Sequence, residues 1–136
     1  MNFKNRRKWL LSTTYNVDKL KYVKKPEAKA LFKLEETLRD KLFDLLKEIN
    51  AYDKISELLP FLHSLAMQEI NNQLRLHAAF WKQDHEGNLV EKKISLGTVG
   101  LRMEKKEREK QATKYHEIKA TFTALRHVSQ AIEALI

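Results

Sequence analysis

The sequence predicts an all-α fold, a helical bundle of three long helices with one or two short N-terminal helices. Apolar residues recur at helical spacings of three and four over most of the chain. The 136 residues include only three glycines and two prolines, fewer than the turns of a many-stranded β-protein require. A hydrophobic fraction of 43% argues against full disorder. The length fits one domain over residues 1–136.

The first long helix is expected over 27–50. Pro26 suits the first position of a helix, and Glu27 stands near the positive end of its dipole. A leucine-rich stripe then follows at spacings of three and four, made of Leu31, Leu34, Leu38, Leu42, Leu45 and Ile49. Glu35, Asp40 and Asp44 are expected on the exposed face of this helix, where carboxylates are poor candidates for catalysis.

The second long helix is expected over 56–83, completing a helical hairpin over 26–83. Ser56 can cap it, which places Pro60 in its first turn. Alternatively, Asp53 caps the helix and Pro60 kinks it. The expected buried face is Leu59, Leu62, Ala66, Ile70, Leu74 and Trp81. Residues 84–100 contain all three glycines and are interpreted as a long loop, with a small hairpin as an alternative.

The third long helix is expected over 101–136. Its second half keeps an apolar 3-4 repeat from Tyr115 to Ile136, whereas 102–114 has only Met103 and Ala112 as apolar residues. A helix over residues 101–136 extends about 54 Å, at about 1.5 Å per residue. Its charged first half is therefore expected to project beyond the core or to lie beside a partner.

The net charge of +8 is concentrated at the N-terminus. Residues 1–25 carry eight bases and one acid, a net of +7, and the other 111 residues carry +1. Such a block indicates a polyanionic partner, above all nucleic acid. Trp9 can stack on a base or anchor in the core. The candidate residues are Lys4, Arg6, Arg7, Lys8, Trp9, Lys19, Lys21, Lys24 and Lys25.

A second basic feature is the row Arg102, Lys106, Lys110 and Lys114, spaced by four along the third predicted helix. Lys105 and Arg108 flank this row. The row can bind phosphates. The interleaved glutamates allow the alternative of a solvated, salt-bridged helix face.

Catalytic and metal-binding motifs are absent from the sequence. Without cysteine there is no disulfide and no thiolate zinc site. None of the five histidines has Asp or Glu three or four residues away, so neither helical metal pattern occurs. His77 is expected to pack among Leu74 and Trp81, and His63 to lie at a polar edge. With no phosphate loop, serine elbow or cysteine nucleophile, we expect no enzyme activity and no cofactor.

Targeting segments are also absent. Only Trp9-Leu10-Leu11 follows the basic start, which is too short for the apolar core of a secretion signal. No run approaches the ~18 apolar residues of a membrane span. We therefore expect a cytoplasmic protein with no membrane partner.

These observations predict a small, non-enzymatic nucleic-acid-binding protein. It would contact the backbone of RNA or single-stranded DNA, rather than duplex, without reading sequence. In size, charge and helix content the chain is similar in outline to the small helical subunits of CRISPR surveillance complexes and to helical accessory proteins of reverse transcriptases. That resemblance implies an accessory subunit of a larger nucleoprotein complex, with protein partners or self-association.

The alternative is a structural or assembly protein. It would bind a protein partner through the charged helix and an apolar bundle face around Phe61, Met67, Phe80 and Trp81.

Overall fold

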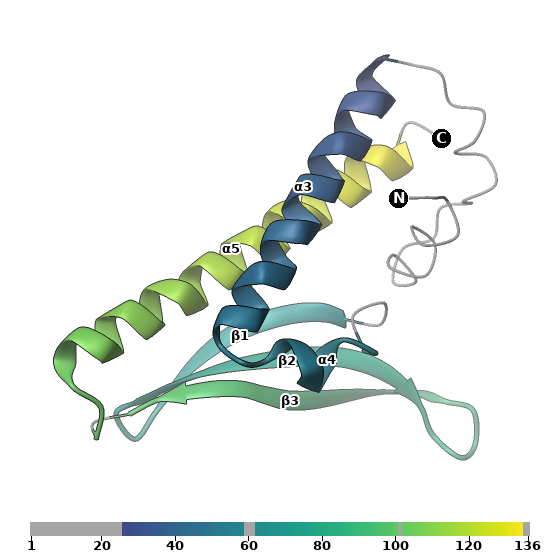
Figure 1. Ribbon diagram of the computed structural model, residues 1–136. Coiled ribbons are helices and arrows are strands. Elements are labelled where there is room, and N and C mark those ends of the chain that lie inside the picture. Colours follow the sequence, from purple (N-terminus) through teal and green to yellow (C-terminus); the bar gives the residue numbers. More distant parts are fainter. Residues whose placement is uncertain (1–25, 59–61, 101, 135–136) are drawn as a thin grey trace.

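The computed structural model describes residues 26–58, 62–100 and 102–134. Two helices lie together on one side of an antiparallel sheet (Figure 1). In chain order the elements are α3 (Pro26–Glu48), α4 (Tyr52–Ile55), β1 (Leu62–Ile70), β2 (Gln73–Gln83), β3 (Leu89–Val99) and α5 (Lys105–Ala134). The sheet order is β1-β2-β3, so each strand pairs with its neighbour in the chain.

This mixed architecture overturns the predicted all-α bundle. The helix expected over 56–83 does not exist, and the helical hairpin expected over 26–83 is wrong. Residues 62–83 instead form β1 and β2, which pair in antiparallel register from Ile70↔Gln73 outward. The loop expected over 84–100 is also wrong, because β3 occupies Leu89–Val99.

The turn between β1 and β2 explains the first error. Asn71 and Asn72 both have positive φ, 51° and 63°. Two central residues with positive φ make a type I′ turn, whose twist matches that of paired strands. Asparagine tolerates this left-handed backbone conformation better than most residues. A helix cannot contain such a pair, so the chain reverses here.

A β-bulge interrupts the two-residue alternation of β1. The register shifts between Leu62 and Ser64, and the extra residue puts Leu62 and Leu65 on the same face at a helical spacing of three. In β2, by contrast, Leu74, Leu76, Ala78 and Phe80 share one face, as alternate residues of a strand do, although Ala79 between the last two is buried as well.

The turn between β2 and β3 is built by an aspartate. The Asp84 carboxylate accepts hydrogen bonds from the backbone N–H of Glu86 and of Asn88, both at 2.9 Å. Gly87 follows with φ 84°, a conformation that glycine adopts without strain. The turn joins two long strands and does not open the long loop expected over 84–100.

The core lies between the helices and one face of the sheet. Leu42, Leu45 and Leu46 of α3 meet Tyr115, Ile118, Phe122 and Leu125 of α5 and Leu62, Leu65, Leu76, Ala78, Leu96 and Val99 of the sheet. Gly97 allows the closest approach, because a Cβ there would collide with the Tyr115 hydroxyl. Among the described residues, no helix covers the second face of the sheet (Figure 1).

The two other predicted helices are confirmed with changed boundaries. The first is α3, with Pro26 at its start, and the third is α5, which begins at Lys105 rather than near 101. Glu35 corrects the predicted exposed face of the first helix, since it is fully buried.

Candidate functional site

The face of the sheet turned away from the helices carries the best candidate site. Because side chains alternate along a strand, the residues of β2 between the core positions lie on this face: Arg75, His77, Ala79 and Trp81. Their strand partners include Ala66 opposite His77, Ser64 and Lys93 opposite Ala79, and Glu91 opposite Trp81. The open face therefore combines aromatic, basic and small side chains.

The β1 bulge places an imidazole on this face. His63 stacks on Trp81, with ring centroids 4.8 Å apart and planes inclined by 24°. Its carbonyl oxygen accepts a hydrogen bond of 2.5 Å from Nη1 of Arg126 on α5, a charge-assisted contact. The helical layer thus fixes the backbone that presents the stacked pair.

Trp81 is 42% exposed although it is stacked. Single exposed apolar side chains are common on protein surfaces, so the exposure of Trp81 counts only together with its stacking on His63. Leu89, which is 65% exposed, pairs with Gln83 two residues further along β2. The stacked pair therefore marks the end of the open face that extends toward the β2–β3 turn.

A shallow groove of about 510 Å³ adjoins the stacked pair. Its lining residues are His63, Ser64, Ala66, Met67, Gln68, His77, Ala79, Glu91 and Lys93. The alanines and Ser64 leave space between the larger side chains at either end. The groove therefore has small side chains at its centre and larger polar side chains at its edges.

Charged and titratable groups surround this hollow. Nε2 of His63 lies 3.3 Å from Oε2 of Glu91, and Nζ of Lys93 lies 4.0 Å from the other oxygen of that carboxylate. Nε2 of His77 and Nε of Arg75 are buried and have no hydrogen-bond partner among residues 26–58, 62–100 and 102–134. Buried polar atoms without a partner are exceptions that call for an explanation.

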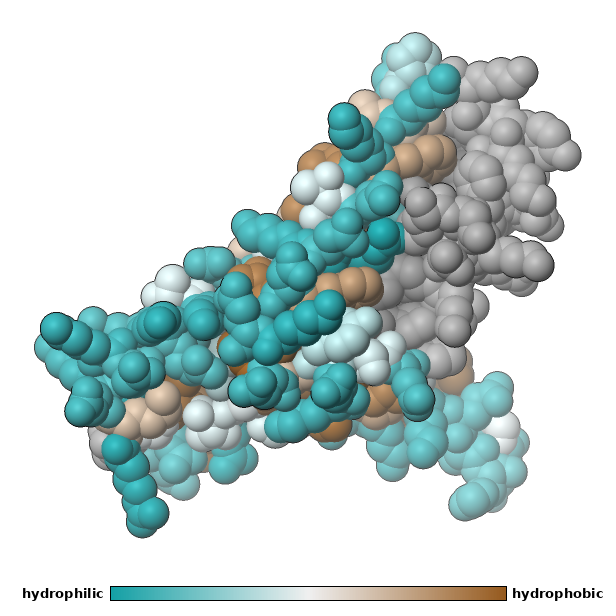
Figure 2. Space-filling view, in the orientation of Figure 1, coloured by the Kyte–Doolittle hydropathy of each residue, from teal (hydrophilic) through white to brown (hydrophobic). Residues whose placement is uncertain are grey.

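The second predicted basic feature is less continuous than expected. Arg102 precedes α5, so only Lys106, Lys110 and Lys114 share the helical row. Nζ of Lys114 lies 3.8 Å from Oε2 of Glu48. The surface over the first turns of α5, at the left of Figure 2, is nonetheless hydrophilic, with Lys105, Lys106 and Lys110 exposed.

Lys105 and Arg108 line a different, shallower hollow of about 310 Å³ beside the β1–β2 turn. Glu69 and Glu109 line it too, so acidic groups balance its bases. This hollow is therefore less suited to a phosphate than the predicted row of bases on the third helix indicated. The N-terminal candidates, Lys4 to Lys25, lie outside the described residues.

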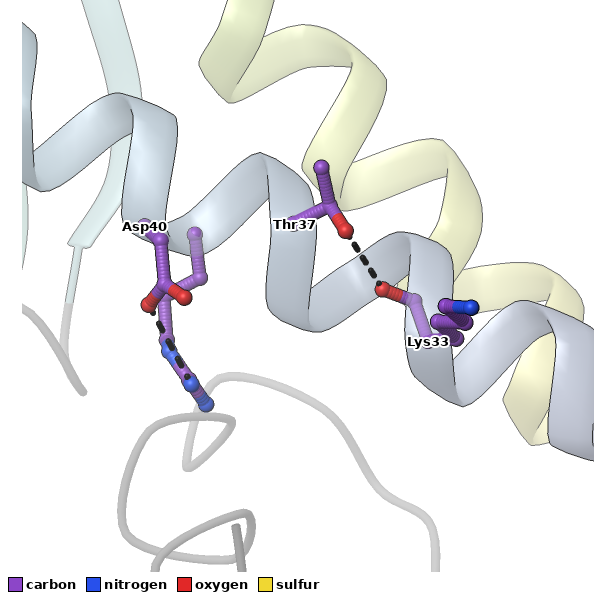
Figure 3. A network of polar contacts seen from close by, with 4 residues as sticks. Lys33, Thr37 and Asp40 are labelled. Atoms are coloured by element: carbon purple, nitrogen blue, oxygen red, sulfur yellow. Dashed lines mark hydrogen bonds and ion pairs between the residues drawn. The ribbon is translucent and has the colours of Figure 1, made fainter.

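The polar face of α3 carries two contacts between residues close together in this helix. Thr37 donates a hydrogen bond of 3.0 Å to the carbonyl oxygen of Lys33, and Nη2 of Arg39 lies 3.5 Å from Oδ1 of Asp40 (Figure 3). Nothing in these contacts gathers groups for chemistry. The open face of the sheet is therefore the stronger candidate.

The expected surroundings of His77 were partly wrong. His77 shares the open face with Trp81, but Leu74 points to the core side. No group of three His, Asp or Glu side chains within the described part of the chain could hold a metal ion. Nor does any helix described here have the length and apolar character needed to cross a membrane.

Comparisons with known proteins assign the chain to no family. No family model, no curated protein and no solved structure matches the chain. The outline similarity to helical CRISPR and reverse-transcriptase accessory proteins depended on helix content, and the three-stranded sheet removes that basis.

Sequence reasoning missed every residue of the groove. The available signal was the strict alternation of Leu74, Leu76, Ala78 and Phe80, which leaves Arg75, His77 and Trp81 on the opposite face. Applying that alternation would have placed two titratable side chains and an aromatic one together on a sheet.

Proposed function

We propose that the protein binds single-stranded nucleic acid, RNA or DNA, on the open face of its sheet. The observation that carries this proposal is the exposed His63–Trp81 stack beside a groove that contains Lys93. Aromatic side chains on an open surface stack on unpaired bases with little regard to sequence, and nearby cations neutralise the phosphates. Bases paired in a duplex cannot stack in this way.

The distribution of charge supports the same ligand. The excess of +7 over residues 1–25 suits a polyanion, and the exposed lysines at the start of α5 would extend the attraction along the molecule. We place this binding in the cytoplasm.

The described residues give the protein-partner alternative less support. Phe80 is buried and Met67 packs against the core, and Phe61 lies outside the described residues. Trp81 and Leu89 remain exposed, but two side chains make a small patch for a protein interface.

Replacing Trp81 tests the proposal. Trp81→Ala should lower the affinity for a labelled single-stranded oligonucleotide by roughly 5- to 150-fold, because base stacking contributes about 1–3 kcal/mol per base. Fluorescence anisotropy at fixed salt measures this change. Leu34→Ala is the matched control, since Leu34 is similarly exposed, at 46%, but lies on α3.

The proposal fails if both variants bind like the original protein. It also fails if the original protein binds no single strand at low salt, because phosphate contacts are then absent.

A further inference from the structure

The two outer strands of the sheet, β1 and β3, each leave one edge without a partner strand among the described residues (Figure 1). On such an edge, the N–H and C=O groups of every second residue point away from the sheet. These groups can bind a further strand, and natural proteins usually prevent this with charged side chains, lysine above all. The two edges differ in that protection.

β3 carries the protective charges and β1 does not. Glu91, Lys92 and Lys93 follow one another in β3, and all three are exposed. Over Leu62–Ile70, which is β1, the one Asp, Glu, Lys or Arg residue is Glu69, next to the end of the strand. The edge of β1 is therefore the better template for a further strand.

The helical layer limits the part of this edge that a further strand can use. Nη1 of Arg126 donates a hydrogen bond to the carbonyl oxygen of His63, at the bulge. The available edge therefore extends over residues 64–70, where Ala66, Gln68 and Glu69 are exposed.

This edge is complementary to a second copy of itself. Directly opposed residues of an antiparallel pair lie on the same face of the sheet, so a two-fold axis between two β1 strands must pass through a residue. With the axis at Ala66, Leu65 of each copy lies opposite Met67 of the other on the helix side. Ser64 then lies opposite Gln68 on the open side. Apolar side chains thus meet apolar ones, and polar side chains meet polar ones.

An axis at Met67 fits less well. It would place the Glu69 carboxylate of each copy opposite Leu65 of the other, which is buried. A carboxylate that loses water beside an apolar side chain is destabilising. The axis at Ala66 pairs residues 64–68 and leaves Glu69 beyond them.

We propose that two copies of the chain pair through their β1 strands, antiparallel, about a two-fold axis at Ala66. The two three-stranded sheets then form one continuous sheet, with the helices of both copies on one side. Ser64, Ala66 and Gln68 line the groove of each copy, so the two grooves meet at the axis. Each copy contains a whole groove, so this dimer goes beyond the proposed nucleic-acid binding and does not depend on it.

The absence of cysteine from the sequence allows a direct test with single cysteines. Ala66→Cys places a thiol of each copy at the axis, where opposed Cα atoms are roughly 4.5–5.5 Å apart, a distance that a disulfide spans. Incubation with oxidised glutathione should therefore convert most of this variant to a covalent dimer, measured by non-reducing gel electrophoresis.

Two further cysteine variants serve as controls. Ser95→Cys is matched to Ala66→Cys, because both residues are exposed and pair with His77, from opposite edges of the sheet. It should form little covalent dimer. Gln68→Cys tests the register: the two thiols would be four residues apart along the strands, roughly 13 Å, too far for a disulfide.

Sedimentation velocity at increasing concentration tests the dimer without a cross-link. The original protein should change from monomer to dimer. Ala66→Lys should raise the dimer dissociation constant roughly 5-fold, because it opposes two like charges at the axis. Ser95→Lys should leave that constant unchanged.

Three results overturn the inference. The first is an original protein that stays monomeric at every concentration, with equally poor cross-linking of Ala66→Cys and Ser95→Cys. The second is cross-linking at Ser95→Cys instead of Ala66→Cys, which places the contact on β3. The third is efficient cross-linking of Gln68→Cys, which contradicts the axis at Ala66. None of them touches the binding proposal, whose readout is the affinity of Trp81→Ala for a single strand.

Discussion

The same strands present different kinds of side chain on the two faces of the sheet. On the helix side, Leu76 and Ala78 are fully buried against α3 and α5. On the open side, the intervening positions hold His77 and Ala79 in the groove, and Trp81 beside it is partly exposed. One face therefore supplies the free energy of folding through apolar burial, and the other is free to carry chemistry.

The largest expected effect is a difference in stability between leucine-to-alanine substitutions on the two faces of the sheet. Leu76→Ala should lower the free energy of unfolding by about 2–5 kcal/mol, because it leaves a cavity in the core. Leu89→Ala, on the open side and 65% exposed, should change it by about 0.5 kcal/mol or less. Urea denaturation followed by circular dichroism measures both. Equal losses would show that the open face also supports the fold.

A smaller effect is expected where β3 approaches α5. Gly97→Ala should cost about 1–3 kcal/mol, since the added methyl collides with the Tyr115 hydroxyl. Tyr115→Phe removes that hydroxyl, so the double variant should recover part of the loss, measured by the same denaturation. Strictly additive losses in the two variants would contradict the contact.

The smallest expected effect tests the turn between β1 and β2. Asn72→Gly should raise stability by a few tenths of a kcal/mol, because glycine adopts the φ of 63° at this position more readily than asparagine. In the helix first predicted for 56–83, the same change would lower stability. The sign of the shift in thermal melting temperature therefore discriminates between a turn and a helix.

The helices could be predicted from sequence because local spacing determines them. Leu38, Leu42 and Leu45 mark α3 without knowledge of any distant partner. Residues 62–70 could not be assigned in this way, since the bulge at His63 interrupts the alternation that marks a strand. The asparagine pair at 71–72 was the one local sign of a reversal.

The candidate site could not be predicted from short sequence patterns, because its residues are brought together by the pairing of the strands. His63 and Glu91 are 28 positions apart in the chain, and only the pairing of β2 with both neighbours brings them to 3.3 Å. Overall charge, by contrast, could be counted directly from the sequence, and it supports the proposed polyanionic partner.

The most direct test of the open face as a binding surface uses its own tryptophan. The chain has two tryptophans, Trp9 and Trp81, so Trp9→Phe leaves Trp81 as the only indole fluorophore. Titration with a single-stranded oligonucleotide should quench Trp81 emission to saturation, with a midpoint equal to the Kd from anisotropy, and an equivalent duplex should quench it much less. Anisotropy that reports tight binding while Trp81 emission stays constant would place the strand elsewhere and contradict the account.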